Sequence, residues 1–208
     1  MTIILAVDQS TSATKAMLFT GDASLLDHAS VSHRQIFPRA GWVEHDADEI
    51  YQNMILALRN LRDKDPDTFK KAAWLSITNQ RETIVIFDRK SGEPLYNAIV
   101  WQDRRGEAFC AQIRNSEHAE TLRRKTGLFA DTYFPAGKLT WVTKNCPEIT
   151  GKIKNGSALI GTIDTYLIYR LTKGKVYATD HTNASRTLFY DIGLRDWDRD
   201  LLEMFGLP

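Results

Sequence analysis

Apolar residues recur along this chain with the two periods that distinguish strands from helices. Short apolar runs bounded by polar or glycine-containing turns predict β-strands. They lie at 2–8, 16–19, 24–36, 73–78, 83–88 and 95–101. Residues 45–61 follow helical spacing instead, because Ile50, Met54, Leu58 and Leu61 recur on one face. This segment is the first clear helix of the sequence.

That helix has a recognisable start. Asp46 stands where an N-cap belongs, and Glu49 follows three residues later, which is the spacing of a capping box. Further helices are predicted at 103–116, 117–125, 137–145 and 198–205. Residues 158–175 predict a strand and then a helix, ended by Gly174 at the C′ position. Strands followed by strands mixed with helices indicate an α/β layered fold. We expect one domain over residues 1–208, with a helical elaboration at 103–155.

Composition narrows the class of protein without identifying it. The chain has 208 residues, 43% of them hydrophobic, which is enough to bury a core. A net charge of +1 gives no basic excess for nucleic acid or an anionic membrane. No apolar run reaches the roughly 18 to 20 residues that cross a bilayer. The start shows neither the basic n-region nor the small-residue cleavage site of a signal peptide, so none is expected. Cys110 and Cys146 fit no metal spacing. We expect a cytoplasmic protein with no nucleic-acid or membrane partner.

The first candidate site is the polar turn between the first two predicted strands. Asp8 ends a buried strand, Ser10, Thr11 and Ser12 follow, and Lys15 lies just beyond. Phosphate binding needs such donors, and a carboxylate can hold Mg²⁺ through its water shell. A turn that satisfies its own backbone has the same composition, and no Walker A motif occurs. The turn alone leaves both interpretations open.

The second candidate is the pair Arg81 and Glu82, at the mouth of the apolar run 83–88. Neighbours on a regular strand point to opposite faces, so both can touch one ligand only if the backbone bends there. Arg81 would donate to ligand hydroxyl oxygens, and Glu82 would accept from ligand hydroxyl groups. The alternative is a surface salt bridge between the two, worth under about 1 kcal/mol.

Two aromatic residues and one acidic residue complete the candidates. Trp101 offers an apolar wall for the carbon face of a polyol, or is ordinary core. Tyr133 offers a hydroxyl on a rigid ring. Asp103, before Arg104 and Arg105, is predicted to be a helix N-cap.

Six segments in this order resemble the amino-terminal half of the glycerol kinases, a branch of the FGGY carbohydrate kinases. They are AVDQSTSATKA, PRAGWVEHDADEIY, ITNQRET, YNAIVWQDRR, GTIDTYLIYRLTKGKVYATDHTNASRTLFYD and DWDRDLL. The similarity extends from about residue 3 to the end of the chain. GWVEHD and NQRET are the motifs most specific to the glycerol kinase branch.

The resemblance implies ATP-dependent phosphorylation of glycerol to sn-glycerol 3-phosphate. It implies the ribonuclease H-like, actin-type ATPase fold, in which a mixed β-sheet is flanked by helices. The positions of Arg81, Glu82 and Tyr133 would bind glycerol, and Trp101 would pack against it.

The same resemblance gives the first turn a role in binding ATP. Thr11, Ser12 and Ala13 would face the phosphates, Lys15 would contact the nucleotide, and Asp8 would lie near Mg²⁺. The catalytic carboxylate base and most of the adenine site are expected beyond residue 208. These 208 residues would then hold half of the active site of a larger, homo-oligomeric kinase and would be inactive alone.

Some positions depart from the family pattern DQGTTSSR. Ser10 replaces a glycine, Ala13 a serine and Lys15 an arginine. Loss of glycine restricts the backbone, and lysine gives a point charge in place of a bidentate fork. The alternative function is therefore a related FGGY kinase acting on another polyol or a ketose such as xylulose.

Two other classes compete with a kinase. A nuclease of the same broad fold would need carboxylates converging on two metals and a basic face for the phosphodiester backbone. The near-neutral net charge counts against it. A sugar-sensing domain derived from a kinase would keep Arg81, Glu82, Trp101 and Tyr133 equally well. A catalytic aspartate in the full-length gene would favour the enzyme.

Overall fold

The computed structural model describes residues 2–207, which fold into two compact units. Unit 1 comprises residues 2–35 and 45–80, and unit 2 comprises residues 36–44 and 81–207. Each unit has its own β-sheet and is described by itself. The single domain expected from the sequence stays a prediction.

Unit 1 is built on a four-stranded mixed sheet of order β3-β2-β1-β5. Its strands are β1 (Ile3–Gln9), β2 (Ala13–Thr20), β3 (Leu25–Ser32) and β5 (Ala72–Asn79). The first three are antiparallel neighbours, joined by short turns, and β5 runs parallel to β1. All four strands were predicted from the apolar pattern, with ends that differ by a few residues.

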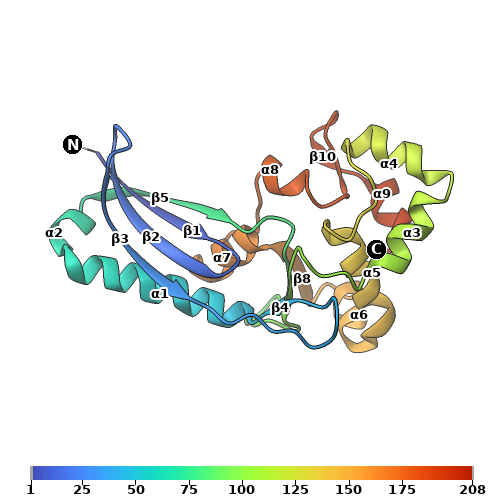
Figure 1. Ribbon diagram of the computed structural model, residues 1–208, viewed down its shortest axis with the longest axis horizontal. Helices are drawn as coiled ribbons and strands as arrows, with labels where there is room; N and C mark the ends of the chain where they lie inside the picture. Colours follow the sequence, from blue (N-terminus) through green and yellow to red (C-terminus); the bar gives the residue numbers. More distant parts are fainter. Residues whose placement is uncertain (1, 208) are drawn as a thin grey trace. The chain divides into compact units, whose positions relative to one another are not determined.

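One helix, α1 (Ala47–Lys64), lies along this sheet (Figure 1). It buries Ile50, Met54 and Leu61, and alternate residues of β1 are buried as well. Ala57 and Leu61 of α1 share one core cluster with Ile3 and Leu5 of β1, so the helical period and the two-residue period meet there. The short helix α2 (Pro66–Phe69) follows.

The start of α1 confirms one prediction and corrects another. The Asp46 side chain accepts hydrogen bonds from the backbone N–H groups of Asp48 and Glu49, as an N-cap does. The Glu49 carboxylate does not close a capping box, since its two oxygens accept from the backbone N–H and the Nε of Arg34. The Glu49 carboxylate thus bonds to Arg34, in the segment before the helix, and not to the backbone N–H of Asp46 as a capping box would require.

Unit 2 is built on a second four-stranded sheet, of order β4-β7-β6-β8. The strands are β4 (Glu44–His45, of which Glu44 belongs to unit 2), β6 (Ile84–Asp88), β7 (Ala98–Ile99) and β8 (Ala158–Thr162). Strand β6 is antiparallel to both β7 and β8. Four consecutive residues of β6 are buried, which explains why its sequence is a continuous apolar run and does not alternate.

Seven helices belong to the described part of unit 2. They are α3 (Glu107–Arg114), α4 (His118–Thr126), α5 (Pro135–Asn145), α6 (Pro147–Lys154), α7 (Ile163–Leu171), α8 (His181–Ala184) and α9 (Arg199–Met204). Among them, α6 and α7 contact this second sheet directly. A small hairpin of β9 (Tyr190–Asp191) and β10 (Asp196–Trp197) precedes α9. The helices α3 to α6 fall within the predicted helical elaboration at 103–155. None of the helices in residues 2–207 has the length and apolar character needed to span a membrane.

Three local predictions need correction. The strand expected over 95–101 is reduced to Ala98–Ile99. The single-turn helix α8, which Asp180 caps, is not among the predicted helices. Helix α7 ends before Gly174: Lys173 already takes the left-handed conformation at φ 54°, and Gly174 follows at φ 79°. The Gly174 N–H then closes the helix end on the Tyr169 carbonyl.

Candidate functional site

In unit 1 the predicted phosphate turn is the tip of the β1–β2 hairpin. Asp8 lies directly across from Lys15 in the register of the two strands, so their side chains share one face of the sheet. Thr11 and Ser12 occupy the turn, and Ala13 begins β2. The structure therefore gathers all five predicted phosphate-site residues at this hairpin end.

Ser10 fits the turn without glycine's conformational freedom. The residues that adopt positive φ do not include Ser10. Its backbone N–H and its hydroxyl both donate to the Ala13 carbonyl, each at 2.9 Å. The serine that departs from the family pattern thus closes the turn itself, and the restriction expected from a missing glycine does not arise.

The other face of the hairpin rests on buried polar side chains that sequence reasoning missed. Gln80 donates from its backbone to the Gln9 carbonyl at 2.7 Å, and its side-chain amide contacts Gln9 and Nδ1 of His45. Nε2 of His33 lies 2.8 Å from the Thr11 carbonyl oxygen. The two histidine rings are 4.9 Å apart. These contacts fix the backbone of the turn.

Burial controls the protonation of both histidines. Desolvation lowers the pKa of His45 to about 4, with a smaller contribution from the positive charge of a protonated His33, while Glu49 opposes the shift. Desolvation also lowers the pKa of His33, against the opposing effects of its bond to Thr11 and of Glu49. Nε2 of His45 and Nδ1 of His33 are buried without a hydrogen-bond partner among the described residues. The pair is neutral near pH 7.

In unit 2 the pair Arg81 and Glu82 lies in a turn immediately before β6. Glu82 has φ 64°, a left-handed conformation that is rare for a residue with a long side chain. The bend that a shared ligand would require is therefore present. Strained backbone of this kind concentrates at functional sites.

Glu82 forms its ion pair with Arg186 and not with its neighbour. Nε of Arg186 donates to Oε1 of Glu82 at 2.6 Å. The Glu82 side chain is 4% exposed and that of Arg186 is 32% exposed. Arg81 is exposed and makes no ion pair or side-chain hydrogen bond within residues 2–207. The surface salt bridge between Arg81 and Glu82, the alternative interpretation of the sequence, is not formed.

Trp101 and Tyr133 meet beside this turn. Their ring centroids are 5.4 Å apart, and the Trp101 backbone N–H donates to the hydroxyl of Thr83, the residue after Glu82. The Arg186 guanidinium lies 5.9 Å from the Tyr133 ring centroid. We call the four predicted acceptor-site residues Arg81, Glu82, Trp101 and Tyr133 the clamp; Arg186 lies against two of them, Glu82 and Tyr133.

A buried lysine supports the tyrosine of the clamp. Lys138 lies in the first turn of α5, and its Nζ donates to the backbone carbonyls of Tyr133 and Phe134 at 2.9 and 3.3 Å. Burial lowers its pKa to about 7, although nearby acidic groups, Asp103 first among them, act in the opposite direction. Lys138 therefore fixes the backbone that presents Tyr133.

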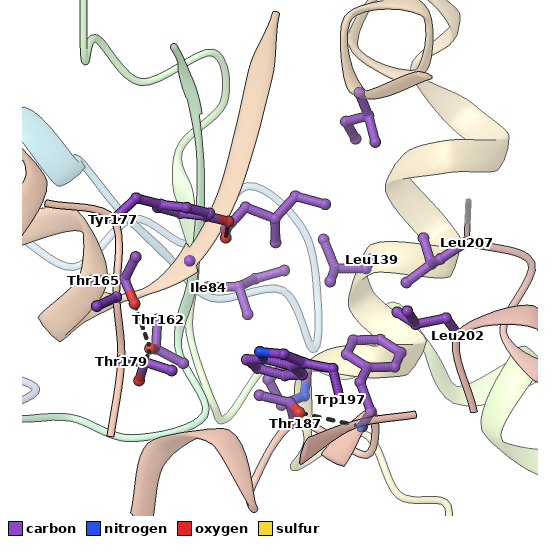
Figure 2. A pocket seen from close by; sticks show the side chains of 16 residues that line it. Ile84, Leu139, Thr162, Thr165, Tyr177, Thr179, Thr187, Trp197, Leu202 and Leu207 are labelled. Carbon is purple, nitrogen blue, oxygen red and sulfur yellow. Dashed lines mark hydrogen bonds between the residues drawn. The ribbon is translucent and has the colours of Figure 1, made fainter. Parts of the chain in front are cut away.

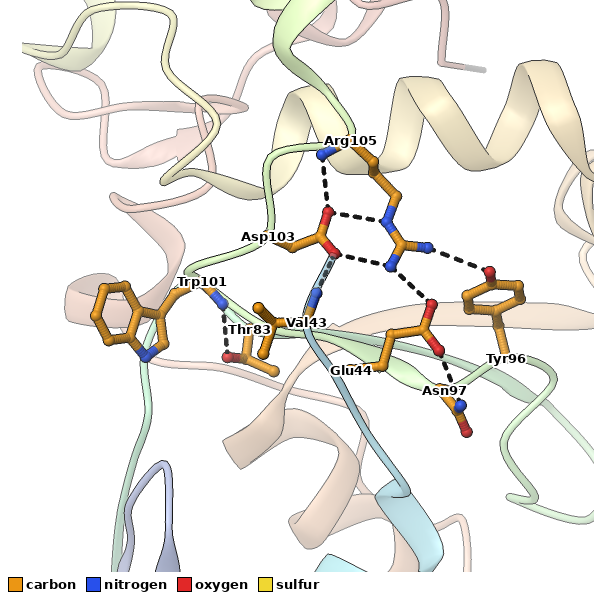
Figure 3. Close-up of polar contacts among 8 residues, drawn as sticks. All are labelled: Val43, Glu44, Thr83, Tyr96, Asn97, Trp101, Asp103 and Arg105. Atoms are coloured by element: carbon orange, nitrogen blue, oxygen red, sulfur yellow. Dashed lines mark hydrogen bonds and ion pairs between the residues drawn. The ribbon is translucent and has the colours of Figure 1, made fainter. Parts of the chain in front are cut away.

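Asp103 does not cap a helix, contrary to the prediction. The N-cap of α3 is Gly106, and Asp103 accepts from the Val43 N–H and from Arg105 (Figure 3). Arg105 also donates to Glu44 at 2.7 Å, and its guanidinium carbon lies 4.0 Å from the Trp42 ring centroid. Burial alone would lower the pKa of Arg105, but its bonds to the two carboxylates raise it. Within unit 2 this network anchors residues 42–44 to the loop that follows Trp101.

Unit 2 also contains an apolar cavity of about 480 Å³, separate from the clamp. It is lined by Ile84, Leu139 and Leu202, with the hydroxyl groups of Thr162, Thr165 and Thr179 on one side (Figure 2). The Thr162 hydroxyl contacts those of Thr165 and Thr179, and Thr179 also donates to Asp164. None of the residues predicted to bind substrate or nucleotide lines it.

The described residues offer one carboxylate suited to a hydrated cation near the phosphate turn. Asp8 is half-buried and makes no side-chain hydrogen bond or ion pair within residues 2–207. A group of three or more possible metal ligands does not occur in this part of the chain. A single free carboxylate fits Mg²⁺, which keeps most of its waters and binds through one or two carboxylates and substrate phosphates.

The comparison with known families agrees with the fold and the motifs. Residues 3–208 match the model of the FGGY family of carbohydrate kinases, N-terminal domain. The chain belongs to this family. The resemblance inferred from the motifs is confirmed, and so is the actin-type kinase fold.

Among its relatives are glycerol kinase 1 of Thermotoga maritima, 43% identical, and the glycerol kinase of Nitratidesulfovibrio vulgaris, 44% identical. Each alignment covers 99% of this chain, and 42% and 41% of the relatives respectively. The chain therefore spans about two fifths of the length of these family members.

Solved structures agree with this family assignment. The structure of Plasmodium falciparum glycerol kinase with ADP matches 99% of this chain and 41% of its own, with a TM-score of 0.91 and 40% identity. A xyloylose kinase of Brucella ovis matches 99% of this chain and 41% of its own, with a TM-score of 0.89 and 26% identity. The FGGY family shares the fold, and sequence identity is higher toward the glycerol kinases.

Proposed function

We propose that the whole protein transfers a phosphoryl group from ATP to a small polyol, and that the polyol is glycerol. The clamp is the observation that carries this proposal. An indole ring packs beside a phenol, and a carboxylate is held at one oxygen by an arginine. The higher identity to glycerol kinases than to the xyloylose kinase supports glycerol over a ketose.

Each residue of the clamp has a hydrogen-bonding capacity that suits a hydroxyl-rich ligand. The guanidinium of Arg81 and the hydroxyl of Tyr133 make no side-chain hydrogen bond within the described residues, and Oε2 of Glu82 accepts none. Arg81 would donate to hydroxyl oxygens, Glu82 would accept from a hydroxyl hydrogen, and Tyr133 can do either. Trp101 would cover the carbon face of the polyol.

The hairpin turn of unit 1 is proposed to bind the ATP phosphates. Thr11, Ser12 and Ala13 would donate to phosphate oxygens, and Lys15 would add positive charge. Asp8 would hold Mg²⁺ through water; when bound, the ion neutralises charge on the phosphates. Phosphoryl transfer depends mainly on positioning and charge neutralisation, so these roles would supply most of the catalysis.

The proton of the attacking hydroxyl needs a general base. We propose that a carboxylate outside residues 1–208 supplies it in the whole protein, together with most of the adenine site. This agrees with a match to about 42% of the length of a relative. We further propose a cytoplasmic homo-oligomer, a location in which free Cys110 and Cys146 would stay reduced.

ATP consumption by the whole protein tests the proposed function. Glycerol, dihydroxyacetone, xylulose and gluconate are compared at equal concentration with Mg²⁺ present. We expect the highest kcat/KM with glycerol, and a lower but still measurable kcat/KM for glycerol in Glu82→Gln. A preference for xylulose would move the protein to the alternative branch, and turnover of none of the four would overturn the proposal. The isolated chain of 208 residues is expected to release no ADP under the same conditions.

A further inference from the structure

Arg186 contacts the clamp although no pattern in the sequence points to it. It follows helix α8 by two residues, and its Nε lies 2.6 Å from Oε1 of Glu82. Its guanidinium carbon lies 4.9 Å from the Phe134 ring centroid and 5.9 Å from that of Tyr133. One side chain therefore touches both the carboxylate of the clamp and the segment that presents its phenol.

The charge on Glu82 requires a partner. A carboxylate that is 4% exposed pays a large desolvation cost unless an opposite charge or several donors compensate it. Arg186 makes the one ion pair that Glu82 has among the described residues. Without that partner the carboxylate would be free to turn toward solvent, and Oε2 would no longer be held in one direction for a ligand hydroxyl.

The geometry of the pair leaves capacity for a ligand. Arg186 uses Nε and engages one carboxylate oxygen, whereas a bidentate fork would occupy both. Oε2 of Glu82 makes no hydrogen bond to the described residues, and it is not among the side-chain atoms that are both fully buried and unpaired. Arg186 therefore holds Oε1 and leaves the hydrogen-bonding capacity of Oε2 unused among the described residues.

A purely stabilising role explains these observations less well. Nearly buried ion pairs contribute little net stability, and apolar residues of similar size often do better. The glutamate also occupies a strained left-handed backbone position at φ 64°. A residue that combines backbone strain with a nearly buried charge is better explained by ligand binding than by stability.

We propose that Arg186 is a positioning residue of the acceptor site, holding Glu82 so that Oε2 accepts from one particular hydroxyl of the polyol. Arg186 thereby sets the preference for acceptors that carry this hydroxyl. The proposal rests on the proposed polyol kinase function and extends it to a residue that acts through Glu82.

The test is carried out on the whole protein with glycerol and its two deoxy analogues, propane-1,2-diol and propane-1,3-diol. Glu82→Gln first identifies the diol whose kcat/KM changes least, which is the one lacking the hydroxyl that Glu82 contacts. Arg186→Met should raise the KM for glycerol about tenfold, the loss of roughly one charge-assisted hydrogen bond. It should also reduce the preference for glycerol over that same diol about as much as Glu82→Gln does.

Three controls separate positioning from folding. Arg114→Met removes another arginine–glutamate pair of unit 2, with Glu107, and should change neither KM nor the preference. The KM for ATP of Arg186→Met should stay within about twofold of the wild-type value, because the substitution affects only the acceptor site. Guanidinium ion added to Arg186→Ala, and the conservative Arg186→Lys, should each restore part of the preference for glycerol.

The effects of Glu82→Gln and Arg186→Met should also be non-additive in the double variant, since both remove the same contact. Additive losses, or equal losses with glycerol and both diols together with a lower Tm, would assign Arg186 a structural role and overturn the inference. If the wild-type protein phosphorylates glycerol and Arg186→Met keeps its preference, this inference alone fails. A wild-type protein that phosphorylates no polyol overturns the proposed function and this inference with it.

Discussion

Glu82 combines two features that destabilise the folded state, a left-handed backbone and a nearly buried carboxylate. Its φ of 64° forces the chain to turn before β6, and its side chain is 4% exposed. Arg186 compensates the charge of the Glu82 carboxylate, but this ion pair does not relieve the strain of the left-handed Glu82 backbone. The free energy of unfolding should therefore respond to the backbone and the side chain of this residue separately.

Replacing Glu82 by glycine and by alanine separates the two effects. Both variants lose the ion pair with Arg186, but only glycine adopts positive φ without strain. We expect Glu82→Gly to be more stable than Glu82→Ala by roughly 1 kcal/mol, measured by urea unfolding. Exposed Gln52 in α1 is the matched control. There, alanine should be the more stable substitution by a similar amount. Equal stability of the two Glu82 variants would contradict the assignment of strain.

At the scale of elements, Arg105 joins segments that are distant in sequence. Its guanidinium bonds to Asp103 and Glu44 and lies near both the Trp42 and the Trp141 ring, with its central carbon 4.0 and 5.0 Å from their centroids. Its side chain has no exposed surface. The planar fork serves both carboxylates at once, which a lysine ammonium group cannot do with the same geometry.

Arg105→Lys should therefore destabilise unit 2, although the charge is retained. We expect a loss of roughly 2–4 kcal/mol in the free energy of unfolding, because one buried carboxylate loses its partner and the contact of the guanidinium with the two rings is removed. The neighbouring Arg104 is exposed, so Arg104→Lys should change stability by less than about 0.5 kcal/mol. The measurement is chemical unfolding followed by circular dichroism. A loss as small as that of Arg104→Lys would mean that the network is dispensable.

At the scale of the whole molecule, the two units should respond to opposite ends of the pH range. In unit 1 the pKa of His45 falls from 6.5 to about 4 on folding, so its stabilising neutral form is favoured above pH 6.5 and stability is lost as pH falls toward 4. In unit 2 the pKa of Lys138 falls from 10.5 to about 7. The free-energy cost of burying the charged Lys138 ammonium group is fully present below pH 7. It is relieved as pH rises toward 10.5, so unit 2 becomes more stable over that range.

Hydrogen exchange followed by mass spectrometry can measure each unit separately. After correction for intrinsic exchange rates, amides of unit 1 should lose protection between pH 7 and pH 5, and amides of unit 2 should gain it between pH 7 and pH 9. His45→Gln should flatten the first response and Lys138→Met the second. If either variant shows the same change of amide protection with pH as the wild type, the residue that it replaces is not the source of that change.

The sequence by itself determined the elements, the hairpin end and the family. Apolar periods located all four strands of the first sheet and the helix against it, because each element shows its own buried face locally. The candidate residues at 8–15 and the clamp followed from motifs in a fixed order. The expected bend at Glu82 also followed, since neighbours on a straight strand cannot share a ligand.

Only the tertiary structure decided which partner each polar residue has. Glu49 bonds to Arg34 and not to its own helix start, Asp103 bonds to Arg105 and Val43, and Glu82 pairs with Arg186, 104 positions away along the chain. Local spacing favours a neighbour for each of these carboxylates. Long side chains, however, bond to whatever donor the packing of distant elements brings close. For Asp103 and Glu82, which are nearly buried, burial then fixes the choice, because an unpaired charge inside the protein costs more free energy than a local preference contributes.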